Sequence, residues 1–260
     1  ASHRLAHGTS NSPGIMPTMI LTGAASGLCR CIADHPARAC YNVGVLDLVL
    51  DQAQVVAESI GGIALKADVS DLPSVETAFE TFGETPDVLI NNAGILRTGA
   101  LLDHTLEDFR RVMDVNLTSV FLVAQIAARR MKSAGGGCII NMSSINGINP
   151  STQCGAYATA KAGVIALSKQ MSMEWGAYNI RVNTIAPGFI DAGMQAPFFE
   201  NQSVRDLRSN AVPLKRLGSA DDVAECALFL ASDKAQYISG ENITVDGGVI
   251  HSVLMQLPRS

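Results

Sequence analysis

The feature of this sequence that most limits its fold is a regular alternation of short β-branched runs with longer helical patterns, which begins at Thr18. Parallel strands need a crossover connection between them, usually a helix, so this alternation predicts stacked βαβ units and a mostly parallel sheet. The runs typical of strands are residues 18–22, 43–47, 63–67, 88–91, 138–142, 181–185 and 242–245.

Two long helical patterns lie in the second half of the alternation. Apolar residues such as Val112, Val115 and Val120 recur at helical intervals between about residues 106 and 132, and a second pattern runs from about 156 to 178. Such helices cover a sheet face or form a subunit interface, and periodicity does not distinguish these cases. No repeat or linker interrupts the alternation, so residues 18–260 are predicted to form one domain.

Residues 1–17 have a different composition, with Ser, His, Gly, Asn and Pro and no apolar run. This composition is typical of a flexible arm or a vector remnant outside the fold. The absence of Asp and Glu before Asp34 is shared with organelle transit peptides, although Arg4 is the one positively charged residue of the arm.

Charge and cysteine content exclude several classes of partner. The net charge is -5 and no Lys/Arg run is present, which argues against nucleic acid. The apolar stretches are too short to span a membrane. Six cysteines form no CxxC pair and join no histidine cluster, so no metal is expected and reduced thiols favour a cytoplasmic location. Charged residues make up only 17% of the chain, which favours a homo-oligomer.

A glycine-containing turn, TGAASGL at residues 22–28, lies between the first expected strand and the helix after it. Dinucleotide phosphates bind at such turns because glycine allows close backbone approach and the helix N-terminus offers free N–H groups. A purely structural turn is the alternative.

Asp47 lies at the end of the second expected strand, where an acid can bind both ribose hydroxyls of an adenosine. Leu48 is not basic, and a carboxylate at this position repels a 2'-phosphate, so the sequence favours NAD over NADP. A solvated strand-end aspartate is the alternative, and Asp51 competes for the role although it falls where the next helix begins.

Ser144, Tyr157 and Lys161 form a candidate catalytic set. Four residues of helix put the Tyr157 phenol and the Lys161 ammonium on one face. Because an unperturbed phenol has a pKa of about 10, a neighbouring cation is needed for acid–base work near neutrality. Ser144 can donate a hydrogen bond to a carbonyl oxygen on which charge develops. Taken singly, each of these three residues could equally be an ordinary surface or turn residue.

Together these motifs resemble the short-chain dehydrogenase/reductase family, from about Thr18 to Val249. The motifs, in order, are Thr22-Gly23-x-x-x-Gly27, Asn91-Asn92-Ala93-Gly94, Asn116, Ser144, Tyr157-x-x-x-Lys161 and Pro187-Gly188. The resemblance implies an α/β fold with a Rossmann-type doubly wound parallel sheet of about seven strands and helices on both faces. It also implies a dimer or tetramer that uses NAD(P) to oxidise alcohols or reduce ketones.

The resemblance also assigns roles to individual residues. Tyr157 is similar to the general acid–base, Lys161 to the residue that lowers its pKa and holds the nicotinamide ribose, Ser144 to the hydroxyl that orients substrate, and Asn116 to the anchor of a proton relay. Asp68 and Val69 resemble contacts to adenine, and main-chain groups of Ile190 resemble those that bind the nicotinamide carboxamide. The expected cofactor contacts are Gly23, Ser26, Gly27, Leu28, Asp47, Asp68, Val69, Asn92, Tyr157, Lys161 and Ile190.

Three positions depart from the family pattern. Cys29 replaces a glycine that permits tight helix packing near the pyrophosphate, and Ala192 replaces a threonine whose hydroxyl helps to hold the cofactor. Pro36 falls inside the expected helix after the glycine turn, which predicts a break or kink near His35.

The function expected is NAD-dependent interconversion of a small, uncharged secondary alcohol and a ketone. Segment 188–213 is the longest irregular stretch and is typical of a lid, with a surface excursion as the alternative. The apolar residues expected in the pocket walls are Ile145, Ile148, Met194, Phe198 and Phe199. Two other functions are a non-catalytic dinucleotide sensor and an epimerase or dehydratase that recycles NAD.

Overall fold

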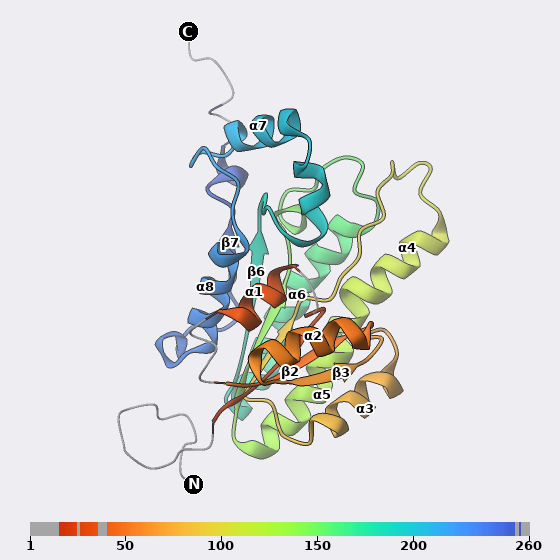
Figure 1. The fold of residues 1–260 in the computed structure, drawn as a ribbon. Helices are drawn as coiled ribbons and strands as arrows, with labels where there is room; N and C mark the ends of the chain where they lie inside the picture. Colours follow the sequence, from red (N-terminus) through yellow and green to blue (C-terminus); the bar gives the residue numbers. More distant parts are fainter. Residues whose placement is uncertain (1–15, 25–26, 36–40, 253–254, 256–260) are drawn as a thin grey trace.

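All the predicted strands form one parallel sheet in a computed structural model, which describes residues 16–24, 27–35, 41–252 and 255. The strand order is β3-β2-β1-β4-β5-β6-β7 (Figure 1). The strands are β1 (Thr18–Thr22), β2 (Asn42–Asp47), β3 (Ile63–Lys66), β4 (Val88–Asn91), β5 (Gly137–Met142), β6 (Ile180–Pro187) and β7 (Asn242–Val245). The windings on the two sides of the β1–β4 pair run in opposite directions, as in a doubly wound fold.

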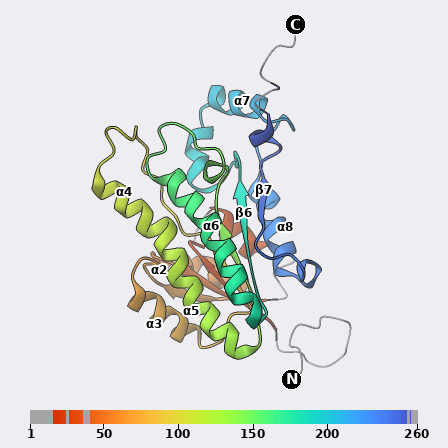
Figure 2. The same ribbon diagram turned by 180° about the vertical axis from the view of Figure 1, so that it is seen from behind.

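Helices cover both faces of the sheet. On the face nearest the viewer in Figure 1 lie α1 (Gly27–Asp34), α2 (Leu50–Ile60) and α8 (Ala220–Ala231). On the other face, seen in Figure 2, lie α3 (Leu72–Phe82), α5 (Ser119–Ala134) and α6 (Tyr157–Trp175). Two shorter helices, α4 (Leu106–Met113) and α7 (Gln202–Ala211), lie toward the carboxyl ends of the strands. The predicted α/β fold class is therefore confirmed.

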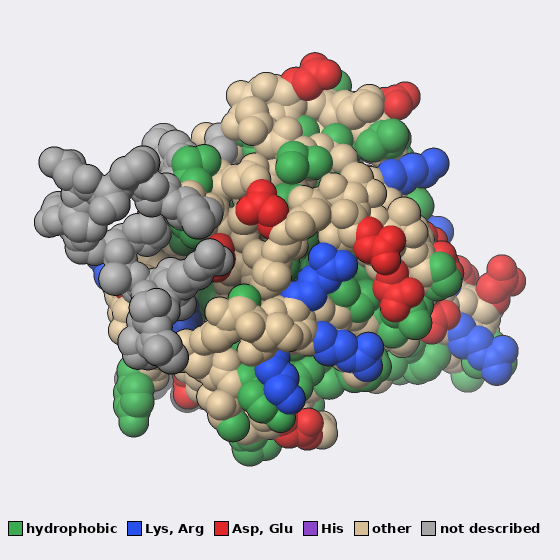
Figure 3. All heavy atoms as spheres, turned by 90° about the horizontal axis from the view of Figure 1, so that it is seen from below, with side chains coloured by type: hydrophobic (Ala, Val, Ile, Leu, Met, Phe, Trp, Pro, Cys, Tyr) green, Lys and Arg blue, Asp and Glu red, His purple; other side chains and the backbone are tan. Residues whose placement is uncertain are grey.

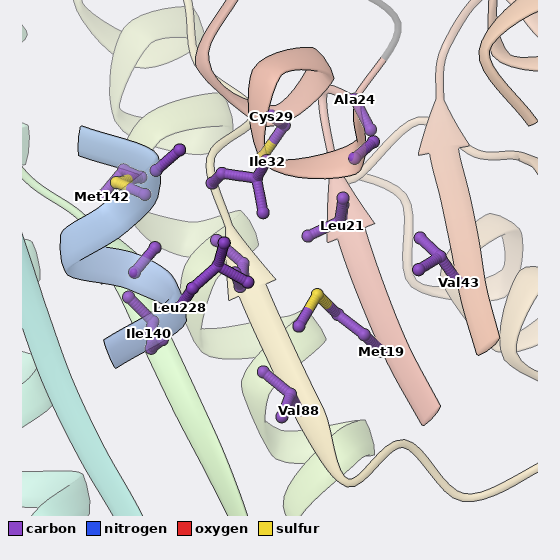
Figure 4. Packing of buried hydrophobic residues seen from close by; sticks show 14 of the residues in the cluster. Met19, Leu21, Ala24, Cys29, Ile32, Val43, Val88, Ile140, Met142 and Leu228 are labelled. Atoms are coloured by element: carbon purple, nitrogen blue, oxygen red, sulfur yellow. The ribbon is translucent and has the colours of Figure 1, made fainter. Parts of the chain in front are cut away.

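The side chain of Cys29 fills the gap between α1 and the sheet. It is fully buried in the apolar layer that contains Met19, Leu21, Ile32 and Leu228 (Figure 4). Burial raises the pKa of its thiol, because a thiolate is poorly solvated there. The departure from glycine at this position is therefore accommodated by core packing, where cysteine behaves as a small apolar residue.

Helix α1 packs against α8, from the far end of the chain. The Cys31 thiol donates a hydrogen bond of 2.9 Å to Asp221, and His35 Nε2 lies 3.1 Å from Glu225 Oε1. Helix α1 ends at Asp34, close to the break predicted from proline, and Pro36 itself lies outside the described residues. The glycine turn is thus supported by the last helix of the fold.

The long helix predicted from about residue 106 to 132 is continuous from Leu106 to Ala134, but it contains a π-helical turn at Asp114–Thr118 between α4 and α5. The Ser119 hydroxyl donates to the Val115 carbonyl over 2.6 Å within this turn. By length and mean hydropathy the helix could cross a membrane, yet 56% of its most apolar window is buried inside the fold. A helix whose apolar window is mostly buried inside the fold is typical of a helix that packs in a core.

Segment 188–213 is not irregular, contrary to the sequence-based expectation. It contains a 3₁₀ segment at Gly193–Phe199 and helix α7, which begins where the Asn201 side chain accepts hydrogen bonds from the Ser203 and Val204 amides. Helix α7 has no buried residue, so its sequence lacks the apolar stripe on which periodicity depends.

The face turned away from the carboxyl ends of the strands carries charges of both signs. Figure 3 shows Lys and Arg side chains interspersed with Asp and Glu and with apolar side chains, without a continuous basic patch on that face. Among the residues that the structure describes, no group of three or more His, Cys, Asp or Glu side chains is placed to hold a metal ion.

Candidate active site

A cleft of about 490 Å³ opens at the carboxyl ends of the strands, where β1 and β4 lie side by side. Ligands of doubly wound sheets bind at this reversal point because the loops there diverge to opposite faces. The predicted cofactor residues that line the cleft are Gly23, Gly27, Leu28, Asp47, Asp68, Val69, Asn92, Tyr157, Lys161 and Ile190. Ser26 lies outside the described residues.

The floor of the cleft depends on two glycines. Gly23 has φ +62° and Gly27 has φ +63°, in the left-handed region. A Cβ atom on Gly23 would lie 2.8 Å from Ala93 Cα, and a Cβ on Gly27 would lie 2.9 Å from Gly193 Cα. Side chains are therefore excluded where the turn meets the main chain at Ala93 and Gly193, and the two glycines line the cleft just before α1, whose N-terminus suits the pyrophosphate of a dinucleotide.

Asn92 and Thr22 hold this turn against β4. The Thr22 hydroxyl accepts hydrogen bonds from the main-chain amides of Asn92 (3.0 Å) and Ala93 (3.1 Å). The Asn92 side-chain amide donates to the carbonyls of Thr22 and Gly23 over 3.4 and 3.3 Å. Asn92 thus lines the cleft, and its side chain fixes the glycine turn.

The end of the cleft where adenosine was expected is lined by Asp47 and Asp68, and also by Leu48. Arg111 also lines it, with its guanidinium 3.5 Å from the Asp68 carboxylate. Burial raises the pKa of Asp68, but hydrogen bonds from Ser70 and the charge of Arg111 outweigh this effect and leave the pKa below its ordinary value. Asp68 is therefore ionised at neutral pH.

At the other end of the cleft Ser144, just after β5, meets Tyr157, the first residue of α6. Burial raises the pKa of Tyr157, and a hydrogen bond with Ser144 lowers it in part. The lowering effect was predicted to come from Lys161. In the structure it comes from Ser144, and burial outweighs it, so the Tyr157 phenol is protonated at neutral pH.

Lys161 lies one turn along α6 from Tyr157, as the spacing predicted. Its side-chain nitrogen is 5.7 Å from the centroid of the Tyr157 ring and donates a 2.7 Å hydrogen bond to the Met142 carbonyl. The residue is 4% exposed. Burial lowers the pKa of Lys161 to about 8, because a charged ammonium loses its hydration there.

Asn116 is fully buried in the π-helical turn and does not line the cleft, although its neighbour Val115 does. Its side-chain oxygen accepts from the Ile95 amide and its side-chain nitrogen donates to the Ile95 carbonyl, each over 2.8 Å. The side chain therefore joins the long helix to the loop after β4, with both its groups engaged.

The first residues of the 3₁₀ segment Gly193–Phe199 form one wall of the cleft, and they agree only in part with the wall residues predicted from the sequence. Met194 lines the cleft as expected, together with Gln195, which sequence reasoning missed. Phe198 and Phe199 are absent from the described lining and pack around the Arg208 guanidinium, 5.9 and 5.5 Å from their ring centroids. Nothing in the spacing of these aromatic residues distinguished a pocket wall from a packing cluster.

Two other predicted wall residues, Ile145 and Ile148, also lie outside the described lining. Ile145 is buried in the turn after Ser144, and Ile148 is 37% exposed. The cleft wall beside Ser144 is instead formed by Met142, the last residue of β5, and Ser143.

Comparison with known proteins places the chain among oxidoreductases. Residues 23–250 match the family described as Enoyl-(Acyl carrier protein) reductase. The chain is 38% identical over 242 residues to the 3-oxoacyl-(acyl-carrier-protein) reductase FabG of Chlamydia trachomatis, covering 89% of this chain and 96% of the relative. It is 34% identical over 238 residues to the D-threitol dehydrogenase of Mycolicibacterium smegmatis, covering 88% and 91%.

A solved structure shows the same architecture. The 7α-hydroxysteroid dehydrogenase complexed with NADH and 7-oxo glycochenodeoxycholic acid has a TM-score of 0.83 and 33% sequence identity, with 89% of this chain and 93% of that chain covered. The names of these three similar proteins describe a 3-oxoacyl group, D-threitol and a steroid, so the likeness extends across very different substrates.

Proposed function

The chain belongs to the short-chain dehydrogenase/reductase family, and within that family we propose that it is an NAD-dependent enzyme that interconverts a secondary alcohol and a ketone. The observation that carries the proposal is the meeting of Ser144, Tyr157 and Lys161 at one end of a cleft whose other end carries Asp47. A hydroxyl, a phenol and an ammonium placed together suit proton exchange with an alcohol oxygen.

The bound nicotinamide supplies or accepts hydride, and the residues of the protein handle the proton and the oxygen. In reduction Tyr157 gives its proton to the oxygen while the Ser144 hydroxyl donates a hydrogen bond to it. The raised pKa of Tyr157 keeps the phenol protonated at neutral pH, which suits this direction. In oxidation the phenol must first lose its proton, so this direction is favoured by higher pH.

Because Lys161 is not among the groups that lower the pKa of Tyr157 in the structure, the role proposed for it is to hold the nicotinamide ribose beside the Tyr157 ring, whose centroid lies 5.7 Å from the Lys161 side-chain nitrogen. A proton relay through Asn116 would use the main chain, because both polar groups of the Asn116 side chain are bonded to Ile95. The π-helical turn that holds Asn116 interrupts the regular helical hydrogen bonding of the long helix at that point.

The preference for NAD rests on the adenosine end. Asp47 presents a carboxylate at the end of β2, and the next residue, Leu48, is 56% exposed and uncharged. Arg111 is the nearby cation of the cleft lining, and it pairs with Asp68 and donates to Ser70 over 3.0 Å. A 2'-phosphate beside Asp47 would therefore meet the negative charge of its carboxylate, while Arg111, a cation of the described lining, is already engaged by Asp68 and Ser70.

The proposed substrate is small and uncharged, and the protein is proposed to act as a dimer or tetramer. Met194 and Ile95 give the catalytic end apolar walls, whereas the cations of the lining, Lys161 and Arg111, already have partners. Exposed apolar side chains at Leu101 (70%) and Leu102 (95%) are consistent with an interface between copies.

The test is a panel of secondary alcohols and ketones, including polyols, hydroxysteroids and 3-oxoacyl thioesters, monitored by reduced-nicotinamide absorbance with both NAD(H) and NADP(H). Turnover that is faster with NAD(H) is expected. Cofactor binding without turnover across the panel would favour the dinucleotide sensor, and a clear preference for NADP(H) would contradict the role given to Asp47.

A further inference from the structure

Ser143 comes directly before Ser144, and it is buried although it lies on the wall of the cleft. Its hydroxyl donates a 2.9 Å hydrogen bond to the main-chain carbonyl of Lys161, and its amide donates over 2.7 Å to the carbonyl of Ile185 in β6. A serine hydroxyl has one hydrogen to donate. That hydrogen is therefore committed to helix α6 and is not offered to a ligand in the cleft.

Lys161 is held by the same stretch of chain at two further points. Its side-chain nitrogen donates to the carbonyl of Met142 over 2.7 Å. Gly147 ends the 3₁₀ turn that follows Ser144, and a Cβ atom on it would lie 2.7 Å from the carbonyl carbon of Lys161. The chain on both sides of Ser144 therefore rests on Lys161, which leaves the turn little freedom to move relative to the helix.

A second hydrogen bond joins β5 to α6 farther along the helix. There the side-chain amide of Asn141 donates to the Ser168 hydroxyl over 2.8 Å. Residues two apart along a strand point to one face of the sheet, and residues seven apart in a helix lie on one side of it, so this bond and the Ser143 bond follow one another along the same interface. The Ser143 bond is the one at the end of the interface where Tyr157 begins the helix.

The proposed reaction requires Ser144 and Tyr157 to reach one substrate oxygen, yet the two residues belong to different elements. Ser144 precedes the 3₁₀ turn after β5, whereas Tyr157 is the first residue of α6. The residue before Tyr157, Ala156, supplies no side-chain cap to the helix. The separation of hydroxyl and phenol therefore depends on how the turn is attached to α6, and a displacement of about 1 Å at a reacting group can cost about 100-fold in rate.

We propose that Ser143 is a positioning residue, which fixes the separation of Ser144 from Tyr157 by tying the chain before Ser144 to the main chain of Lys161. This inference rests on the proposed interconversion of an alcohol and a ketone. Ser143 does not touch the substrate in this role, and it acts through the placement of Ser144.

The test compares Ser143→Ala with Ser168→Ala. The two serines are 4% and 2% exposed, and each substitution removes a hydrogen bond that joins the same end of the sheet to α6. Both variants should therefore lower the melting temperature by a similar amount, about 2–4 °C. The values of kcat and KM are measured in both directions with the best alcohol and ketone of the panel, together with the dissociation constant of NAD.

We expect Ser143→Ala to lower kcat by about 10-fold to 100-fold, with KM and the dissociation constant of NAD within about threefold of the wild type. Ser168→Ala should keep kcat within about twofold, because Ser168 lies two helical turns from Lys161. The same loss of stability with different losses of kcat would separate positioning from general support of the fold.

The pH profile supplies a second readout. The hydrogen bond with Ser144 lowers the pKa of Tyr157, so a longer contact in Ser143→Ala should leave that pKa higher. Oxidation of the alcohol needs the deprotonated phenol. The pH at which kcat for oxidation reaches half its maximum should therefore be higher in Ser143→Ala than in the wild type and in Ser168→Ala.

Gly147→Ala tests the attachment from the other side of Ser144. The added methyl group would meet the Lys161 carbonyl carbon at 2.7 Å, so the turn must move away from α6 while the Ser143 hydroxyl is retained. We expect a lower kcat and the same upward shift of the pH profile. This variant decides the question if Ser143→Ala does not fold.

Unchanged kcat in Ser143→Ala, or an equal loss in Ser168→Ala, would overturn the proposal and make the Ser143 hydroxyl a general support of the fold. A raised KM with unchanged kcat would also overturn it, because Ser143 would then contact the substrate. A wild type that turns over no alcohol or ketone of the panel refutes the proposed function and this inference together. An active wild type whose Ser143→Ala variant behaves as Ser168→Ala does refutes only this inference.

Discussion

The two ends of the cleft are built in different ways. At the adenosine end the deciding side chains, Asp47 and Asp68, are only half-buried and follow the ends of β2 and β3. At the catalytic end Ser144 and Lys161 are buried, and burial lowers the pKa of Lys161 to about 8. Charges close to water interact weakly, whereas charges in a buried site interact strongly and shift pKa values. Substitutions at the adenosine end are therefore expected to change the preference between NAD and NADP with little loss of activity. Substitutions at the catalytic end are expected to abolish the reaction.

The largest effect is expected at the catalytic end from Tyr157→Phe. Removal of the acid–base hydroxyl should lower kcat by a factor of about 10²–10⁴, while the dissociation constant of NAD changes by less than about threefold. Tyr178→Phe is the control, because Tyr178 is exposed and stacks on Lys132 far from the cleft lining. If Tyr157→Phe kept more than about a tenth of the activity, the mechanism would be wrong.

The second prediction concerns pH and stability. The pKa of Lys161 falls from 10.5 to about 8 on folding, so the unfolded chain binds more protons between these values. The free energy of unfolding should then rise with pH across this window, by about 3 kcal/mol at most. Denaturant melts give the free energy of unfolding of the wild type and of Lys161→Met, and the difference between the two should show this rise. The buried thiols titrate in both proteins, so their contribution cancels in the difference. A difference that stays flat between pH 8 and 10.5 would mean that Lys161 is not desolvated.

Activity should move in the opposite direction over the same range. Above about pH 8 Lys161 loses its charge, whereas Tyr157 keeps its proton because burial raises its pKa. The value of kcat/KM for ketone reduction should therefore decline above about pH 8, and an initial-rate profile would measure it. An activity that stays constant up to pH 10 would exclude a role for the ammonium.

The smallest effect is expected at the adenosine end. Asp47→Asn removes the charge and keeps the shape, so kcat/KM with NAD should fall by about tenfold and the ratio of NAD to NADP use should fall with it. Asp51→Asn is the control, because Asp51 lies in the first turn of α2 and is absent from the described cleft lining. If Asp47→Asn used NAD and NADP in the same ratio as the wild type, Asp47 would not determine cofactor choice, and the proposed difference between the two ends of the cleft would be wrong.

The strand positions could be predicted because a buried parallel sheet requires apolar β-branched runs at regular separation. The pairing of Tyr157 and Lys161 on one helix face followed in the same way from their spacing. Both results depend on local order along the chain, which sequence patterns record directly.

Features that depend on a single inserted residue or on burial were not predictable. Periodicity identified the helix from Leu106 to Ala134, but the approximate spacing of its apolar residues does not show where a π-helical turn interrupts it. The direction of the pKa shift of Tyr157 was also missed, because it depends on how fully the fold surrounds the phenol. Helix α7 was missed for the opposite reason, since no residue of it is buried.

The pairing of α1 with α8 has a consequence for the order in which the protein is made. Ribosomes release the glycine turn and α1 first, whereas Asp221 and Glu225, which bond Cys31 and His35, emerge 190 residues later than their partners. Until then the apolar side of α1, with Ile32, has no cover from α8. A nascent chain is therefore expected to become competent to hold a nucleotide only after α8 has emerged, and chains cut short before α8 should be substrates for chaperones and proteases.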